Sequence, residues 1–251
     1  MFRFVFVLFT ILVMSSCTAD PLASMQKNLA YVAQEKLKKT LAIILSYEMG
    51  KGVDAVITAL AQPGGYLDNP LVRILLPPPL GLAIDVARDM TANPKATLLV
   101  TLMNHAAEQA IPSAAPIIHA ALTKITSAEV RRLLDGDRTA ATEYLKATTK
   151  ESLHAALTPL VAANLAASGA QAVYSELLVA HQAQLPDYHV ENAAPVDAQK
   201  HDLAEYVAEQ AVNGVFKALG AQEIIIRENI DNQTGNVLQG VENHLSNQSQ
   251  K

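Results

Sequence analysis

Two acid–histidine pairs have a spacing that places both side chains on one face of a helix. Glu151 and His154 form an E-x-x-H pattern, and Glu108 follows His105 by three residues. An E-x-x-H pair offers two metal ligands, but the di-metal helical bundles that use it need a second pair and two further glutamates. Because the chain has only one, the sequence predicts no metal and no cofactor. His105 and Glu108 are interpreted as a helix-surface contact.

The common enzyme motifs are missing. The chain has no P-loop, dinucleotide-binding glycine pattern, G-x-S-x-G or H-E-x-x-H. A serine–histidine–aspartate triad is a spatial arrangement, so the sequence neither favours nor excludes one. An enzyme of unrecognised type would draw on four candidate polar residues: Asn104, Glu108, Tyr144 and Arg227. The structural alternative for Arg227 is an ion pair with Glu223 at i−4. Core packing is the alternative for three aromatic residues at helical positions: Tyr144, Tyr206 and Phe216.

Cys17, the only cysteine in the chain, is predicted to be a lipid-attachment site. Arg3 precedes an apolar run that ends at Met14 and is followed by two serines and Cys17. The run, at about eleven residues, is too short to span a membrane, which takes roughly 20, so residues 1–16 read as a signal peptide. Met14-Ser15-Ser16-Cys17 stands where a lipobox stands, and a thiol is the nucleophile that forms a thioether to diacylglycerol. The alternative is a plain signal peptide with an incidental cysteine.

The same segment predicts a location. More than one acyl chain, such as palmitate, gives stable anchoring, and a lipidated Cys17 leaves no thiol for catalysis. By resemblance to the sorting rules of Gram-negative lipoproteins, Thr18 in place of aspartate implies the inner leaflet of the outer membrane, facing the periplasm. Residues 17–24 would be a lipidated tether. Its seven residues after Cys17 reach about 25 Å when extended.

Composition narrows the set of partners. The formal net charge is −5, tryptophan is absent and aromatic residues make up 5% of the chain. An acidic chain without a basic block is a poor nucleic-acid binder. It is also not expected to lie on anionic lipid by electrostatics alone. The expected partners are therefore the membrane through Cys17, and an envelope protein or an apolar ligand.

Helical periodicity runs through nearly the whole chain and predicts an all-α fold. We expect one domain over 25–245 with about nine helices, and a polar tail at 246–251. A long apolar stripe runs from Met25 to Leu60, with Gly50 and Gly52 marking a kink or a close helix contact. The other expected helical segments are 80–92, 95–111, 113–125, 126–136, 138–147, 149–167, 169–183, 202–219, 220–230 and 234–245.

Capping patterns set several of these boundaries. Thr126 and Glu129 form a capping box, and Thr148 with Glu151 forms a second one. Gly136 is expected at the C-terminal cap of the helix that Thr126 opens. Residues 184–201 are polar, contain two prolines and are expected to form an exposed loop.

Residues 62–79, QPGGYLDNPLVRILLPPP, cannot form a regular helix because they hold five prolines and two glycines. They also contain several leucine, isoleucine and valine residues, which we expect to be buried against another part of the protein. We interpret them as a covered crossover that closes one end of the helical core. The alternative is an apolar docking strip.

Several segments together resemble an exported bacterial family known as domain of unknown function 4197. They occur in matching order over about 40–238: 65–70 (GYLDNP), 73–77 (RILLP), 103–108 (MNHAAE), 134–136 (LDG), 140–145 (AATEYL), 202–207 (DLAEYV), 212–216 (VNGVF) and 226–229 (IREN). The resemblance implies an exported helical domain, often lipid-anchored, and supplies no activity or catalytic residues.

The chain departs from the family pattern in four places. His105 stands where an arginine is usual, and Gln222-Glu223 stands where two glutamates are usual. The segment 230–236 lacks the usual proline and arginine, and the loop 184–201 is longer. Any charged site common to the family would be altered here.

Three functions remain open at this stage. The first is a non-enzymatic binding or scaffolding module held at the outer membrane. The second is a carrier of an apolar ligand in a cavity near residues 62–79. The third is an enzyme of unrecognised type acting near the membrane.

Overall fold

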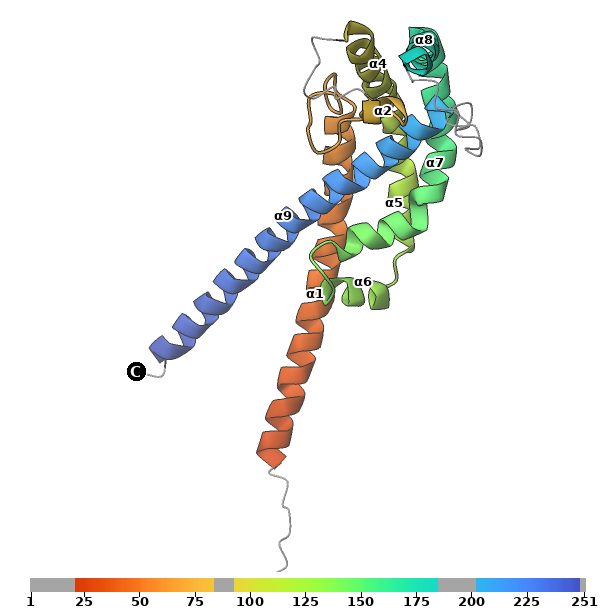
Figure 1. The fold of residues 1–251 in the computed structure, drawn as a ribbon. Coiled ribbons are helices and arrows are strands. Elements are labelled where there is room, and N and C mark those ends of the chain that lie inside the picture. The colour runs from red at the N-terminus through yellow and green to blue at the C-terminus, as the bar shows by residue number, and fades with distance from the viewer. Residues whose placement is uncertain (1–20, 84–92, 185–201, 249–251) are drawn as a thin grey trace, which may run out of the picture. The chain divides into compact units, whose positions relative to one another are not determined.

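The computed structural model describes residues 21–83, 93–184 and 202–248, and within these residues it contains helices and no strands (Figure 1). The elements are α1 (Pro21–Leu60), α2 (Leu80–Ala83), α4 (Pro94–Ala110), a 3-10 turn η1 (Ile111–Ser113), α5 (Ala114–Lys124), α6 (Ser127–Leu134), α7 (Ala140–Ser168), α8 (Ala170–Gln184) and α9 (Leu203–Gln248). The all-α prediction is confirmed.

The chain divides into two compact units, Met1–Lys38 and Lys39–Lys251. The first contains the beginning of α1, and the second contains the rest of α1 and all later helices. Predictions for the signal segment, Cys17 and the loop 185–201 lie outside the described residues. So do those for 84–92 and the last three residues of the tail.

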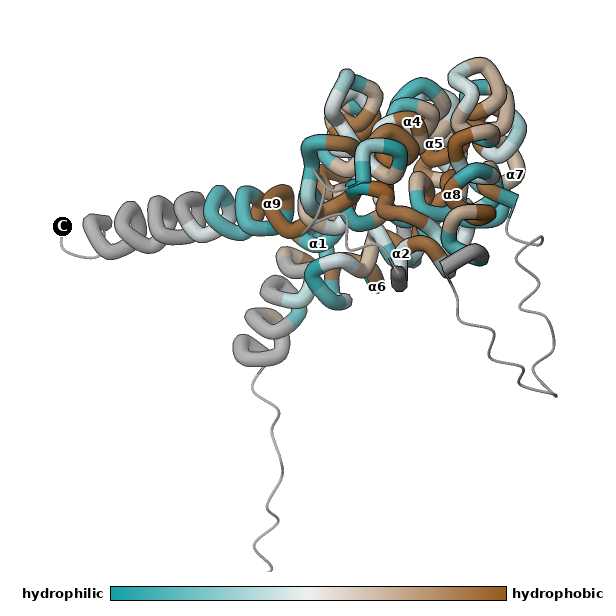
Figure 2. Tube along the Cα trace, turned by 45° about the horizontal axis from the view of Figure 1, so that its top comes forward, coloured by the Kyte–Doolittle hydropathy of each residue, from teal (hydrophilic) through white to brown (hydrophobic). Residues whose placement is uncertain are grey.

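The core of the second unit is built around α7 and α9, which pack against each other. Figure 2 colours the chain by hydropathy and shows apolar and polar stretches alternating along these helices. Along α7 the buried positions recur every four residues, from Leu145 and Thr149 to Leu153, Leu157 and Val161. This spacing keeps one stripe of the helix inside. Helices α4 and α5 also pack against α7.

Three predicted helix breaks are wrong, one within α7 and two within α9, and the expected count of about nine helices changes with them. Segments 138–147 and 149–167 form the single helix α7. The second capping box fails because the Thr148 hydroxyl donates to the Tyr144 carbonyl, at 2.9 Å, within the continuing helix. Segments 202–219, 220–230 and 234–245 form the single helix α9. Gly220 does not interrupt α9, since tertiary packing outweighs the helix propensity of one residue.

Other boundaries agree with the predictions. Segments 95–111, 113–125 and 169–183 correspond to α4, α5 and α8, within one or two residues at each end. The capping box of Thr126 and Glu129 opens α6, with both reciprocal hydrogen bonds present. Gly136 follows α6 directly after its C-cap Asp135.

Among the described residues, no single helix is long and apolar enough to cross a membrane. One pair of helices, Ala140–Ser168 and Ala170–Gln182, passes that length and composition test together, with a bend of 78° between them.

Two glycines allow close contacts, one between two helices and one between α9 and residue 66 of the irregular segment. A Cβ at Gly52 would lie 3.2 Å from Gln222 Cγ and from Ile226 Cδ1, so α1 approaches α9 closely here. Of the two sequence-based alternatives for the Gly50–Gly52 region, the close contact is therefore present. A Cβ at Gly214 on α9 would lie 2.8 Å from Tyr66 Cε1.

Residues 62–79 pack against the core, as the crossover interpretation expects. Tyr66, Val72, Ile74 and Leu76 are buried, and the Tyr66 hydroxyl donates to the Ala211 carbonyl of α9 at 2.8 Å. Burial raises the pKa of Tyr66, and the nearby Glu108 carboxylate raises it further. The segment is irregular in backbone but fixed by its buried side chains.

Substituting Gly214 by alanine should destabilise the protein although alanine is the better helix former. The new methyl group would press on the buried Tyr66 ring, at a cost of about 1–3 kcal/mol. Gly235, on the same helix, has no atom near its would-be Cβ, so Gly235→Ala should stabilise by up to about 1 kcal/mol. Urea unfolding of both variants tests the pair, and equal effects of the two substitutions would contradict this packing.

Candidate functional site

Asn104 and Glu108, two of the four candidate polar residues, lie one turn apart on α4 and are buried. Asn104 Oδ1 accepts a hydrogen bond from Ile74 N at 2.8 Å, and its amide donates to the Ile74 and Val100 carbonyls at 2.8 and 2.7 Å. All of these partners are backbone groups. Asn104 therefore holds residues 62–79 against α4.

Glu108 also binds the backbone of residues 62–79 through its side chain. Its Oε1 accepts from Tyr66 N at 3.0 Å and from Leu67 N at 3.2 Å. Its Oε2 lies 2.8 Å from His105 Nδ1. Helix α4 thus satisfies backbone N–H groups that an irregular buried segment would otherwise leave without partners.

Arg227 forms the ion pair with Glu223 that the i, i+4 spacing suggested, with Nη2 and Oε1 2.7 Å apart. The Glu223 carboxylate also accepts from Ala141 N and Thr142 N, at 3.0 and 2.7 Å, at the first turn of α7. Arg227 donates to the Leu133 and Leu134 carbonyls at the end of α6. The Glu223 carboxylate therefore lies at the positive N-terminal end of the α7 dipole, and the Arg227 guanidinium lies at the negative C-terminal end of the α6 dipole.

Tyr144 lies on a different surface. It lines an open groove of about 440 Å³ between α5 and α7, which also includes Pro116, Lys124 and Ser152. The four candidate residues therefore do not meet in one cleft. The core prediction for the aromatic residues fits Phe216, which is buried, whereas Tyr144 and Tyr206 are partly exposed and each lines a cleft.

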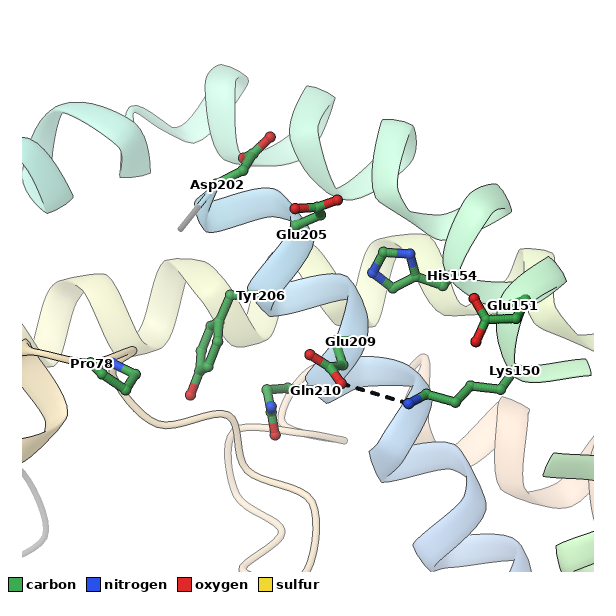
Figure 3. A pocket seen from close by; sticks show the side chains of 9 residues that line it. All are labelled: Pro78, Lys150, Glu151, His154, Asp202, Glu205, Tyr206, Glu209 and Gln210. Atoms are coloured by element: carbon green, nitrogen blue, oxygen red, sulfur yellow. Dashed lines mark ion pairs between the residues drawn. The ribbon is translucent and has the colours of Figure 1, made fainter. Parts of the chain in front are cut away.

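A second cleft, of about 540 Å³, lies between α7 and the beginning of α9. Figure 3 shows side chains from these two helices around it. The lining residues are Pro78, Lys150, Glu151, His154, Asp202, Glu205, Tyr206, Glu209 and Gln210. The E-x-x-H pair thus lies in a cleft, and the partner helix adds three more carboxylates.

The charge in this cleft is unbalanced. Four carboxylates face it, while Lys150 is the only lysine or arginine in its lining. Lys150 Nζ lies 3.7 Å from Glu209 Oε1 (Figure 3). Partial burial raises the pKa of Tyr206, with a further contribution from the Glu209 carboxylate. The Tyr206 hydroxyl donates to the Leu75 carbonyl at 3.1 Å, so the ring is held at the wall of the cleft.

Among the described residues, no group of three or more histidine, cysteine, aspartate or glutamate side chains could hold a metal ion. Glu151 and His154 are thus placed beside other acids without forming such a centre. What the cleft offers is negative charge next to an aromatic ring, which suits a cationic group of moderate size.

The cleft itself was not anticipated from the sequence. The two helices that line it, α7 and α9, are separated in the sequence by α8 and a long connecting segment, so they become neighbours only in the folded protein. One local signal was available: Asp202, Glu205 and Glu209 recur at i, i+3 and i+7 and so lie on one face of α9. Asp202 also caps α9, accepting from Ala204 N at 2.9 Å.

The fold and the buried polar contacts define an all-α protein in which residues 62–79 close over α4 and α9. The family described as "Protein of unknown function (DUF4197)" matches residues 33–242, and the chain belongs to this family. The resemblance stated from sequence segments is thereby confirmed. No curated protein and no solved structure matches the chain.

Removing the Glu223 carboxylate should be strongly destabilising. Glu223→Ala leaves Arg227 without its anion and two buried N–H groups of α7 without an acceptor, which costs about 3–5 kcal/mol. Glu176→Ala is the matched control, since it removes the exposed pair with Lys95 and should cost less than about 1 kcal/mol. Chemical denaturation measures both values. Similar losses in the two variants would show that the buried pair does not hold α6, α7 and α9 together.

Proposed function

We propose that this chain is a lipid-anchored protein of the bacterial envelope that acts by binding a partner. In this proposal the mature protein begins at Cys17, carries acyl chains there and faces the periplasm from the inner leaflet of the outer membrane. The arrangement of Arg3, the apolar run and Met14-Ser15-Ser16-Cys17 supports the anchor.

The cleft between α7 and α9 is the observation that carries the binding role. Glu151, Asp202, Glu205 and Glu209 give it an excess of negative charge, and Lys150 offsets only one of them. The partner we propose is a protein segment that presents lysine or arginine side chains. Electrostatic complementarity of this kind speeds encounter and selects the partner.

The other two functions have less support. An apolar-ligand carrier would need an apolar cavity near residues 62–79. One cleft among the described residues reaches this segment, at Pro78, and eight of its nine lining residues are charged or polar. An enzyme built on Asn104 and Glu108 would need those side chains to reach a substrate. Both are buried and bonded to backbone groups.

The anchor predicts incorporation of labelled palmitate at Cys17 in growing cells. The native chain should carry the label and sediment with outer membranes, because two or more acyl chains hold a protein stably. Cys17→Ser should lose the label and leave the membrane fraction after a high-salt wash. A labelled Cys17→Ser variant, or an unlabelled native chain, would contradict the anchor.

The binding role predicts a position-dependent crosslink. A photoreactive amino acid at Gln210, which lines the cleft, should capture a protein in cells, and the same probe at Gln233, exposed on the same helix, should not. Glu205→Lys should reduce the capture at Gln210 by about tenfold through like-charge repulsion. Glu143→Lys, an exposed charge reversal elsewhere on α7, is the control and should leave it unchanged. No capture at Gln210, or capture that is insensitive to Glu205→Lys, would overturn the proposed binding site.

A further inference from the structure

The ring of Tyr206 lines the cleft between α7 and α9 and is held in place. Its hydroxyl donates to the Leu75 carbonyl at 3.1 Å, and the side chain is half-buried. Because this proton is engaged with the backbone, what Tyr206 offers to a ligand in the cleft is mainly the surface of its ring. Figure 3 shows the ring between Pro78 and Gln210, with Glu209 close to Gln210.

Carboxylates flank this ring on the same helix. Asp202 precedes Tyr206 by four residues and Glu209 follows it by three, which are the spacings of neighbouring side chains on a helix surface. Glu205 precedes Glu209 by four residues, so these two carboxylates are neighbours as well. A cationic group that covers the ring therefore has carboxylates on both sides of it along α9.

The lysine that already lines the cleft does not satisfy these carboxylates. Lys150 Nζ lies 3.7 Å from Glu209 Oε1, which is longer than an N–H···O hydrogen bond. Within the described residues, neither Glu151 nor Glu205 has a hydrogen bond or an ion pair. The cleft therefore keeps unpaired acceptors for a further cation.

We propose that the cleft selects arginine over lysine in the protein segment that it binds, and that Tyr206 sets this preference. The inference rests on the proposed binding role of the cleft. A guanidinium group is planar, stacks on an aromatic face and presents five N–H donors, so it can cover the Tyr206 ring while it donates to Glu205 and Glu209. An ammonium group is a compact, strongly hydrated charge that cannot stack in this way.

The extent of the cleft favours a protein segment over a free guanidinium compound. In the view of Figure 3, Pro78 lies at one end of the lining and Glu151 at the other, with Tyr206 on the side of Pro78. A guanidinium group at Tyr206 leaves Glu151 and its neighbour His154 without a ligand. A segment with a second basic side chain reaches both regions at once, and linking the two contacts raises the affinity.

Two synthetic peptides test this preference on the purified full chain. Both consist of glycine alternating with a basic residue, which is arginine in one and lysine in the other, so that they have equal length and charge. Fluorescence anisotropy of the labelled peptides at physiological ionic strength gives the two dissociation constants. We expect the arginine peptide to bind about fivefold more tightly, because an exposed cation–π contact has an effect of this size.

Substitutions at the ring identify the residue responsible. Tyr206→Leu should lower the affinity for the arginine peptide about fivefold and change that for the lysine peptide by less than about twofold. Tyr206→Phe keeps the ring and should preserve the preference, although the hydrogen bond to Leu75 is lost. Tyr144→Leu, at a partly exposed tyrosine that lines the other groove, is the matched control and should leave both affinities unchanged.

The outcomes separate this inference from the proposed function. Equal affinity of the native chain for both peptides, lowered in both by Glu205→Lys, would overturn the arginine preference and leave the binding role intact. A preference that survives Tyr206→Leu would overturn the role of Tyr206, and if this variant does not fold, the affinities of the native chain still decide the preference. No binding of either peptide would overturn the basic partner itself. Argininamide that binds as tightly as the arginine peptide would assign the cleft to a small guanidinium compound and overturn the protein segment as its ligand.

Discussion

The ion pair between Glu223 and Arg227 joins three helices through their backbones. Glu223 accepts from the first N–H groups of α7, and Arg227 donates to the last carbonyls of α6. Helix ends buried in this way need partners, and here both partners come from one turn of α9. The direction in which the chain leaves α6 and enters α7 depends on this contact, and with it the wall that α7 contributes to the cleft.

Residues 62–79 depend on a second set of buried polar contacts. Asn104 and Glu108 supply side-chain acceptors and donors where the prolines and glycines of this segment rule out a helix. In both places a polar residue within a helix completes the hydrogen bonding of backbone that is not part of that helix. Among the exposed acids between α7 and α9, Asp202 caps α9 and Glu209 lies 3.7 Å from Lys150, and neither of these contacts holds irregular backbone in place. That contrast separates the cleft from the buried polar network.

Local patterns were sufficient for the helical class, the capping box at Thr126 and the Glu223–Arg227 pair, because each depends on residues within one or two turns. They were insufficient at Thr148, a predicted helix start, and between residues 219 and 220, a predicted break. At both places one long helix continues because its buried stripe packs against the core. Asn104 and Glu108 were found as polar residues on an apolar helix, but their partners lie 30 to 42 residues away. The cleft required the positions of α7 and α9, which no pattern within either helix specifies.

The contact of Tyr66 with α9 has a consequence for the order of folding. The Tyr66 hydroxyl donates to Ala211, 145 residues later, and its ring lies against Gly214 on the same helix. A contact over this separation forms only after most of the chain is available, since loop closure must precede it. A chain that passes through a translocation channel N-terminus first, as the proposed export requires, would therefore leave Tyr66 without its final partner until α9 emerges. The tertiary structure that includes the Tyr66 contact therefore forms only after α9 has passed through the channel.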